Sequence, residues 1–436
     1  MQLLTQGLDL NSMKKTKQIS DSILKKRLRR FKSIKRGYYS LIILVSLYFI
    51  SLIAPVLINN QALVVCHANM KYDEGEKFED NNNNGSWDLD ENYEDKYHYY
   101  SPAFSQLFSF IIDENYLEAS FFGQDSIMGK KKFGEPHYRL LKKQFEDEAY
   151  GNYVIMPLYP YGPYEEVLSE RDEFFKDLNK NGKWEVGEPF EDTNNNGKRD
   201  EYYPALFPDS INILGTDNQG RDVFARLIYG LKVSLSFALI VVFFSYIIGI
   251  IMGGMLGYFG GKVDLFGLRL IEIFSAMPFL FLMMILASIF KPSIILLALM
   301  YMTIVGWIAI TWYVRGEFLK EKSKDYVSAA VSMGQSTWKI IIKHILPNAL
   351  TPIITFAPFA VIGYIYSLVA LDFLGFGLQP PTPSWGELLV QGKSNLQYWH
   401  LVIVPLSAIG GTLFLITFIG EAIREAFDPK VFSRLR

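Results

Sequence analysis

Residues 233–259 read VSLSFALIVVFFSYIIGIIMGGMLGYF, a run of 27 residues without a single Asp, Glu, Lys, Arg or His. An α-helix needs about 20 apolar residues to cross the hydrocarbon core of a bilayer. Charge-free runs of similar kind recur along the chain, at residues 38–58, 293–314, 345–371 and 401–420, with a slightly shorter one at 273–290. We therefore predict an all-α polytopic membrane protein with six transmembrane helices.

The charges are segregated along the 436 residues, although the formal net charge is only −2. Residues 59–222 hold 33 Asp and Glu against 16 Lys and Arg, whereas the remainder holds 12 acidic and 27 basic residues. The predicted organisation is a basic arm (1–37), a first transmembrane helix (38–58), an acidic insertion of α/β or irregular structure (59–222), a helical domain with transmembrane helices two to six (223–425) and a short tail (426–436).

The positive-inside rule predicts how the chain is oriented. When six crossings are counted, the basic segments 260–269, 315–344 and 423–436 fall on the same side as the basic arm. We therefore expect cytoplasmic N- and C-termini and an extracytoplasmic insertion. Residues 38–58 are expected to remain as an anchor, because the basic lead-in is long and no small-residue cleavage site follows the apolar run.

Several classes of protein are disfavoured by what the sequence lacks. The single cysteine, Cys66, excludes an intramolecular disulfide framework. No phosphate-binding Gly-x-x-x-x-Gly-Lys-[Ser/Thr] loop is present, and no Ser/His/Asp or Cys/His arrangement suggests a catalytic site. The apolar runs carry no ionisable relay of the kind that proton-driven transporters need, and Lys232 is expected at a helix end. A transporter built on this chain would take its energy from a partner, and we expect no enzymatic activity.

Residues 315–347 form the longest segment on the predicted cytoplasmic side. Two amphipathic helical turns flank Gly334, which can adopt the positive φ that ends one helix and turns the chain into another. Ser328, Ala329 and Ala330 are small enough to allow close approach of another surface, and Pro347 begins the next span. An ordinary helical hairpin between two spans explains the same pattern.

The spacing Ser328-Ala329-Ala330, then Gly334, then His344-Ile345-Leu346-Pro347 resembles the EAA loop of permease subunits in bacterial ABC importers. Ser stands where the name-giving Glu would be, and His stands at a usual Ile position. Further motifs agree with the dipeptide and oligopeptide (DppC/OppC-like) branch, and the tail looks most like its Yej-type subset, linked with microcin C and longer peptides. These motifs are Gly215-Thr216-Asp217, Gly220-Arg221-Asp222, residues 226–230, 257–261, 371–377, 380–387, 418–422 and 426–429.

The resemblance implies a heterodimeric permease of the type I ABC importer fold in the bacterial inner membrane. Its partners would be a second permease subunit, two cytoplasmic ABC ATPase subunits, an extracytoplasmic peptide-binding protein and membrane lipid, with no nucleic acid. Residues 328–338 would form the coupling helix that docks on an ATPase subunit, and the transport part would need no cofactor. The implied coupling residues are Ser328, Ala329, Ala330, Gly334, His344 and Pro347.

The acidic insertion contains three copies of the calcium-loop pattern D-x-[DN]-x-[DN]-G. Alternate residues would supply hard oxygen ligands to one cation, and the glycine allows a sharp turn. The third copy has Tyr203 at the twelfth position and is predicted to be weaker. Solvated Asn/Asp/Gly-rich turns without metal are the alternative. The predicted ligands are Asp80, Asn82, Asn84, Asp88 and Glu91; Asp177, Asn179, Asn181, Glu185 and Glu188; and Asp192, Asn194, Asn196 and Asp200.

Two rival functions remain open at this point. In a calcium-regulated channel or sensor, the acidic insertion would be the regulatory part and the membrane part would conduct. A membrane-anchored hydrolase is disfavoured by the missing nucleophile–base pair. The main prediction is a peptide-importer permease whose insertion is stabilised by structural Ca²⁺.

Overall fold

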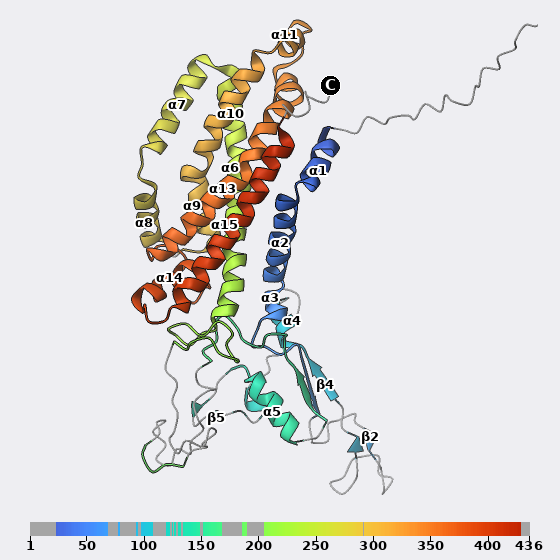
Figure 1. The fold of residues 1–436 in the computed structure, drawn as a ribbon, viewed down its shortest axis with the longest axis vertical. Coiled ribbons are helices and arrows are strands. Elements are labelled where there is room, and N and C mark those ends of the chain that lie inside the picture. Colours follow the sequence, from blue (N-terminus) through green and yellow to red (C-terminus); the bar gives the residue numbers. More distant parts are fainter. Residues whose placement is uncertain are drawn as a thin grey trace, which may run out of the picture.

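A computed structural model describes residues 23–68, 77–78, 93–94, 97–107, 119–122, 124, 126–127, 130–131, 134–148, 151–167, 185–189, 205–290 and 292–428. Long helices form a bundle, and the insertion lies at one end of it (Figure 1). Helices α1 and α11 lie at the opposite end, as Figure 1 also shows. We call these two ends the insertion end and the loop end.

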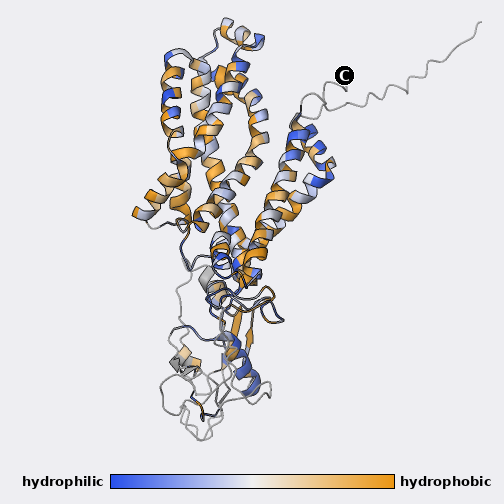
Figure 2. Ribbon diagram, turned by 60° about the vertical axis from the view of Figure 1, so that its left-hand side comes forward, coloured by the Kyte–Doolittle hydropathy of each residue, from blue (hydrophilic) through white to orange (hydrophobic). Residues whose placement is uncertain are grey.

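The long helices correspond to the charge-free runs, and apolar residues predominate along their middles (Figure 2). Among the described residues, four helices are long and apolar enough to cross a membrane, and one bent pair would make a fifth. Helix α2 (Lys35–Leu52), which covers most of the first predicted run, is 18 residues long and starts with Lys35 and Arg36. The total of six spans therefore stays a prediction. The four spans are Val223–Phe259, Ile294–Lys322, Thr337–Phe373 and His400–Phe427.

The shorter predicted run is not one straight helix. Helix α7 (Gly261–Ser275) ends before Pro278, helix α8 (Phe279–Ile289) follows, and the two are bent by 71°. Proline lacks the backbone N–H that would continue the helix. Pro352 and Pro358 lie within α13 (Leu346–Phe373), and Pro405 lies within α15 (His400–Phe427).

Helix α6 (Val223–Phe259) starts ten residues before the charge-free run does. Asp222 caps its N-terminus, because the side chain accepts a hydrogen bond from the backbone N–H of Ala225 at 2.7 Å. Lys232 therefore lies in the third turn of α6. The expectation of a helix-end position for this lysine is wrong.

Helices α6 and α10 (Trp307–Lys322) pack unusually closely. Glycines 249, 253 and 257 recur every four residues on α6 and face α10. A Cβ at Gly253 would lie 2.6 Å from the carbonyl oxygen of Thr311, and a Cβ at Gly257 would lie 2.6 Å from Cβ of Phe318. Small residues at this period let two helix backbones approach within a membrane. Helix α10 leads directly into the 315–347 segment, and α9 (Ile294–Tyr301) and a π-helical turn (Met302–Gly306) precede it.

The N-terminal helices pack on the last helix of the chain. Helix α1 (Ile23–Ser33) and α2 lie beside α15, and Gly37 contacts Ala422. Phe31, Ala422 and Ala426 form a small buried cluster between them. A short helix α3 (Ala54–Leu57) then leads into the insertion.

The insertion contains an antiparallel sheet of order β4-β1-β7 and a helix that packs beside it. Val65 pairs with Tyr100 on one side of β1 and with Val154 on the other. Val65, Leu141, Phe145 and Val154 are buried together in a core of its own. The elements are β1 (Val64–Ala68), β2 (Lys77–Phe78), β3 (Tyr93–Glu94), β4 (Tyr97–Tyr100), α4 (Pro102–Leu107), a 3₁₀ turn (Ala119–Phe122), β5 (Ser126–Ile127), β6 (Lys130–Lys131), α5 (Tyr138–Glu148) and β7 (Tyr153–Ile155).

Candidate functional site: a coupling hairpin and a charge network

At the loop end, the 315–347 segment is a helical hairpin with a sharp corner at Gly334. Helix α11 (Asp325–Ser332) ends there, and Gly334 has φ +73°. The backbone N–H of Gln335 donates to the carbonyl of Ala330 (3.2 Å), and that of Gly334 donates to the carbonyl of Val331 (2.9 Å). This pair of bonds is the Schellman motif, which requires a left-handed residue at the corner. Residues 315–322 continue α10, so the hairpin proper is shorter than the predicted segment.

The hairpin turns one face outward. Val327 and Ala330 are buried in one apolar cluster with Val314 and Phe318 of α10 and with Ile345, which directly precedes α13. Ser328, Ala329, Gly334 and Pro347 are exposed. Ala330 therefore supports the hairpin from within, although its small size had suggested a place at the outer surface.

Large apolar side chains complete this outward face. Val331 is 56% exposed, Met333 70% and Trp338 63%. Exposed apolar residues clustered at one tip mark an interaction surface more often than chance exposure does. We call Ser328, Ala329, Val331, Met333 and Trp338 the docking face.

Polar bonds brace the two arms of the hairpin. The ring nitrogen Nε2 of His344 lies 2.8 Å from Oε1 of Gln335, directly across the corner. The hydroxyl of Tyr326 donates to Glu321 at 2.6 Å and accepts from the amide of Asn348 at 3.2 Å. His344 is half-buried in this arrangement, so it acts here as a brace. After α12 (Thr337–Lys339), a π-helical stretch (Ile340–Ile345) carries His344 into α13.

The part of α10 nearest the loop end is also hydrogen-bonded to the corner between α6 and α7. The Arg315 guanidinium binds the Asp264 carboxylate through two hydrogen bonds of 2.5 and 2.6 Å. Nζ of Lys322 donates to the carbonyl oxygen of Tyr258 at 2.5 Å. Any displacement of the hairpin through α10 would therefore move the start of α7 with it.

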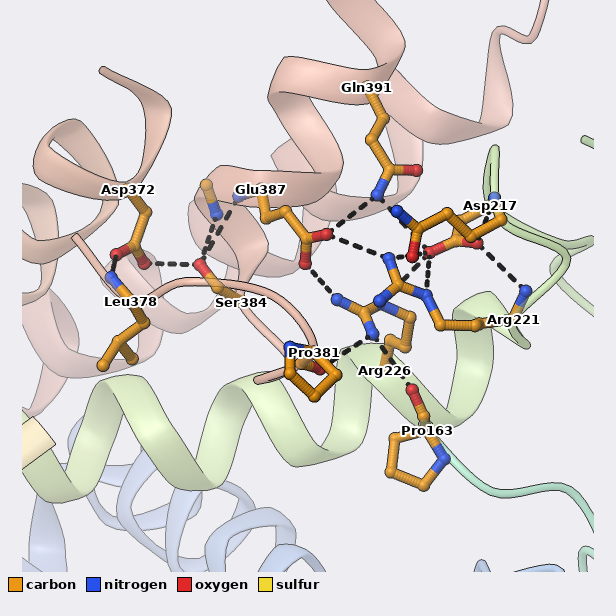
Figure 3. A network of polar contacts seen from close by, with 12 residues as sticks. Pro163, Asp217, Arg221, Arg226, Asp372, Leu378, Pro381, Ser384, Glu387 and Gln391 are labelled. Atoms are coloured by element: carbon orange, nitrogen blue, oxygen red, sulfur yellow. Dashed lines mark hydrogen bonds and ion pairs between the residues drawn. The ribbon is translucent and has the colours of Figure 1, made fainter. Parts of the chain in front are cut away.

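At the insertion end, a buried charge network joins α6 to helix α14 (Trp385–Ser394) (Figure 3). Arg221 Nη2 lies 2.7 Å from Asp217 and 2.9 Å from Glu387. The guanidinium of Arg226, which is completely buried, binds the other carboxylate oxygen of Glu387. The Gln391 amide donates to Glu387 at 3.1 Å. We call these five residues the charge network.

The two positive and two negative charges of the network compensate one another. Burial by itself lowers the pKa of Arg221, but the hydrogen bonds and negative charges of Asp217 and Glu387 outweigh it and raise that pKa. Arg221 therefore remains a cation. A buried ion network of this kind holds two elements in one relative position, and its charges must stay paired.

The insertion is attached to the same region. Nη1 of Arg226 donates to the carbonyl oxygens of Pro163 (3.0 Å) and Pro381 (3.3 Å). The hydroxyl of Tyr159 and the amide of Asn212 each donate to Asp222 at 2.7 Å. Burial raises the pKa of Asp222 above its ordinary value despite these hydrogen bonds. The first turn of α6 therefore carries contacts from both the insertion and α14.

The loop between α13 and α14 is held by a second carboxylate. Asp372 accepts hydrogen bonds from the hydroxyl of Ser384 and from the backbone N–H of Leu378 (2.7 Å) (Figure 3). Trp385 is 1% exposed, and its indole N–H donates to the carbonyl of Leu227 at 2.9 Å. This tryptophan is part of the core at the insertion end.

The predicted calcium ligands lie outside the described residues, with the exception of Glu185 and Glu188. Oε2 of Glu188 accepts a hydrogen bond from the backbone N–H of Glu185 at 3.0 Å, and Glu188 is buried. Among the residues that the structure describes, no group of three His, Cys, Asp or Glu side chains could hold a metal ion. The calcium loops stay a prediction.

Sequence reasoning missed both the charge network and the glycine stripe of α6. Arg221, Arg226 and Glu387 all lie in motifs that support the family resemblance. However, about 160 residues separate the arginines from Glu387 along the chain, so no local pattern predicts their pairing. The stripe had a visible signal, because Gly249, Gly253 and Gly257 repeat at four-residue spacing.

Comparison with known proteins identifies the family. Residues 245–433 match the family described as "Binding-protein-dependent transport system inner membrane component". The chain is 42% identical over 270 residues to the inner membrane ABC transporter permease protein YejE of Escherichia coli (strain K12), which covers 62% of this chain and 79% of that protein. The chain belongs to this permease family. It is therefore a multi-pass helical membrane protein, and the resemblance to the Yej-type permeases is confirmed.

Another relative and one solved structure are similar to parts of this chain. The chain is 38% identical over 224 residues to the oligopeptide transport system permease protein OppC of Haemophilus influenzae, covering 51% of this chain and 71% of that protein. Among solved structures, a chain of the MetNI methionine ABC transporter, in an inward-facing conformation, aligns with a TM-score of 0.40 at 20% identity. That alignment covers 47% of this chain and 97% of the other.

Proposed function

We propose that this permease is one of two membrane-spanning subunits of an ATP-driven importer for peptides. The observation that carries the proposal is the 42% identity to YejE over 79% of that protein, together with relatives that are named as oligopeptide and dipeptide transport permeases. The chain would line the translocation pathway, and the ATPase subunits would hydrolyse ATP. The relatives reported above are all named as permeases, so none of them favours the calcium-regulated channel.

The docking face is the proposed contact with an ATPase subunit. Its apolar side chains stand out from a short helix that is braced on both sides, so the hairpin can transmit a displacement with little bending. ATP binding would draw the hairpins of the two permease subunits together. The movement would pass through α10 to the Arg315–Asp264 pair and so to α7. Lys324, Lys339 and Lys343 are exposed around the face and would position it electrostatically.

The loop end would face the cytoplasm, and the insertion end would face outward. This orientation follows the positive-inside rule, since α1 and the hairpin are rich in Lys and Arg. An extracytoplasmic peptide-binding protein would then deliver cargo at the insertion end. The proposed location is the inner membrane, with both termini cytoplasmic.

Replacing Gly334 tests the coupling role. A Cβ at this position meets no atom within 4 Å, but φ is +73°, so Gly334→Arg strains the corner and projects a long cation onto the docking face. We expect peptide uptake to fall by about tenfold or more in proteoliposomes that contain the complete importer, and ATP hydrolysis to lose its stimulation by the loaded binding protein.

Gly334→Asn is the matched control, because asparagine tolerates the left-handed conformation. This variant should retain most of the uptake. Equal membrane insertion of both variants would show that the loss concerns coupling. Unchanged uptake by Gly334→Arg would exclude the docking role.

We further propose that the loops at residues 80–91 and 177–188 bind structural Ca²⁺, with a weaker site at 192–203. Their support is the spacing of carboxylate and amide oxygens around a glycine, which suits a hard cation. Calcium would stabilise the insertion and take no part in transport.

A further inference from the structure

A cavity of about 750 Å³ lies where the insertion meets α3 and α6. One wall comes from the insertion and the other from the permease helices, so neither part forms the cavity alone. Its lining residues include Glu135, Tyr164, Glu165, Glu166, Tyr229 and Lys232. A volume of this size is ordinary for a site that encloses a small ligand.

Two of the three carboxylates in the insertion wall are already engaged. Glu165 accepts two hydrogen bonds from the Arg139 guanidinium, at 2.7 and 3.0 Å. Glu135 accepts one from the Gln61 amide at 2.8 Å. The exposed Glu166 side chain has no hydrogen bond or ion pair with any other residue that the structure describes. Its negative charge is therefore available to a ligand.

The opposite wall carries one cation. Lys232 is half-buried in the third turn of α6 and lies between Leu231, which is 5% exposed, and Val233. No acidic side chain among the described residues pairs with it. Its ammonium therefore lacks a counter-charge among these residues. An anionic group entering the cavity would supply it.

Two aromatic rings also line the cavity. The rings of Tyr164 and Tyr229 meet edge to face, with centroids 6.5 Å apart, and Tyr164 is 56% exposed. The hydroxyl of Tyr229 is directed elsewhere, since it donates to the carbonyl of Ile58 at 3.1 Å. The cavity therefore offers apolar surface to aliphatic groups, together with one cation and one available carboxylate for groups of opposite charge.

We propose that this cavity binds a short peptide with free termini, whose carboxylate pairs with Lys232 and whose ammonium pairs with Glu166. The inference rests on the proposed function and adds a receiving site between the binding protein and the translocation pathway. Because Lys232 lies on α6 and Glu166 on the insertion, the two charges would also set the direction in which the peptide enters, with its C-terminus toward α6.

Chemically blocked peptides test the two ends separately. The assembled importer in detergent, without nucleotide or binding protein, would be titrated with fluorescent tetra-alanine in four forms: unmodified, N-acetylated, C-amidated and blocked at both ends. Lys232→Gln should weaken binding of the unmodified peptide by about tenfold and leave the C-amidated form unchanged. Glu166→Gln should weaken the unmodified peptide similarly and leave the N-acetylated form unchanged.

The matched controls are Lys142→Gln and Glu146→Gln. These residues form an exposed ion pair on α5 of the same insertion, with nitrogen and oxygen 3.8 Å apart. They change the same charges outside the cavity and should leave all four affinities unchanged.

Equal affinity of the wild type for all four peptides, or equal losses for blocked and free termini in the variants, would overturn the receiving site. A lipid headgroup that carries an ammonium and a phosphate shares this chemistry. Displacement of bound peptide by phosphatidylethanolamine vesicles, without any terminus dependence, would assign the cavity to lipid instead. If the reconstituted importer moves no peptide at all, the proposed function fails. If peptide is imported but binding ignores the termini, only the receiving site fails.

Discussion

At the scale of single residues, the largest expected loss of stability comes from breaking the charge network. Glu387 reaches both arginines from α14 (Figure 3), and Asp217 lies 2.7 Å from Arg221 and 3.4 Å from Arg226. Glu387→Gln would leave two buried guanidinium groups short of negative charge, and breaking a buried pair costs about 3–5 kcal/mol. We expect a clearly lower thermal midpoint for the purified permease, measured by intrinsic fluorescence in detergent.

Glu425→Gln provides the comparison at this scale. Glu425 lies 3.8–4.0 Å from Arg30 and Arg36 and is half-exposed, so its loss should cost less than about 1 kcal/mol. A thermal midpoint that is the same in both variants would argue that the network is not a structural lock.

His67 gives the insertion a pH dependence. Burial lowers the pKa of this imidazole, which stacks on Phe145 with ring centroids 5.6 Å apart. Because the unfolded chain binds the proton more tightly, stability is full above about pH 6.5 and falls as the pH drops toward the lowered pKa. Trypsin should therefore cut the insertion faster at pH 5.5 than at pH 7.5, after correction for enzyme activity. His67→Phe should reduce that difference, and an unaltered difference would assign the effect to another group.

At the scale of elements, the contact between α6 and α10 decides how the hairpin is held. Gly253→Ala would place a methyl group 2.6 Å from the Thr311 carbonyl oxygen and 2.8 Å from Cβ of Val314, so the helices must separate. Overpacking of this kind costs about 1–3 kcal/mol. We expect lower thermal stability and weaker coupling of ATP hydrolysis to uptake.

Gly316→Ala on α10 is the control for this prediction. A Cβ there meets nothing within 4 Å, and alanine favours the helix, so stability should be unchanged or slightly higher. Equal behaviour of the two variants would show that the close approach of α6 and α10 is not required.

At the scale of the whole molecule, the insertion and the bundle are two structures joined at one end of α6. If calcium stabilises the insertion, chelation with EGTA should accelerate tryptic cleavage there while the bundle stays intact. Asp177→Ala should remove much of the protection, because position one of the loop is a primary ligand. Asp147→Ala, on α5 and outside the repeats, should retain it. Equal digestion of the wild type with and without calcium would eliminate the metal sites.

How much could be predicted from the sequence depends on the range over which each signal acts. Hydropathy and charge are properties of neighbouring residues, so the long helices, the acidic insertion and the corner at Gly334 were all visible in short windows. The bend between α7 and α8 could be predicted in part, because Pro278 lacks the backbone N–H that would continue a helix. The outward and inward faces of α11 were not, because Ala329 and Ala330 differ only in what packs against them.

By itself, the sequence determined that this chain is a membrane protein of helical spans, and its motifs determined the family. Tertiary structure alone decided that Glu387 meets Arg221 and Arg226, that Trp385 is buried against α6, and that Lys232 faces a cavity shared with the insertion. The physical reason is that a charge or an indole has no preferred partner along the chain. Which groups share a buried site is set by how helices far apart in sequence pack together.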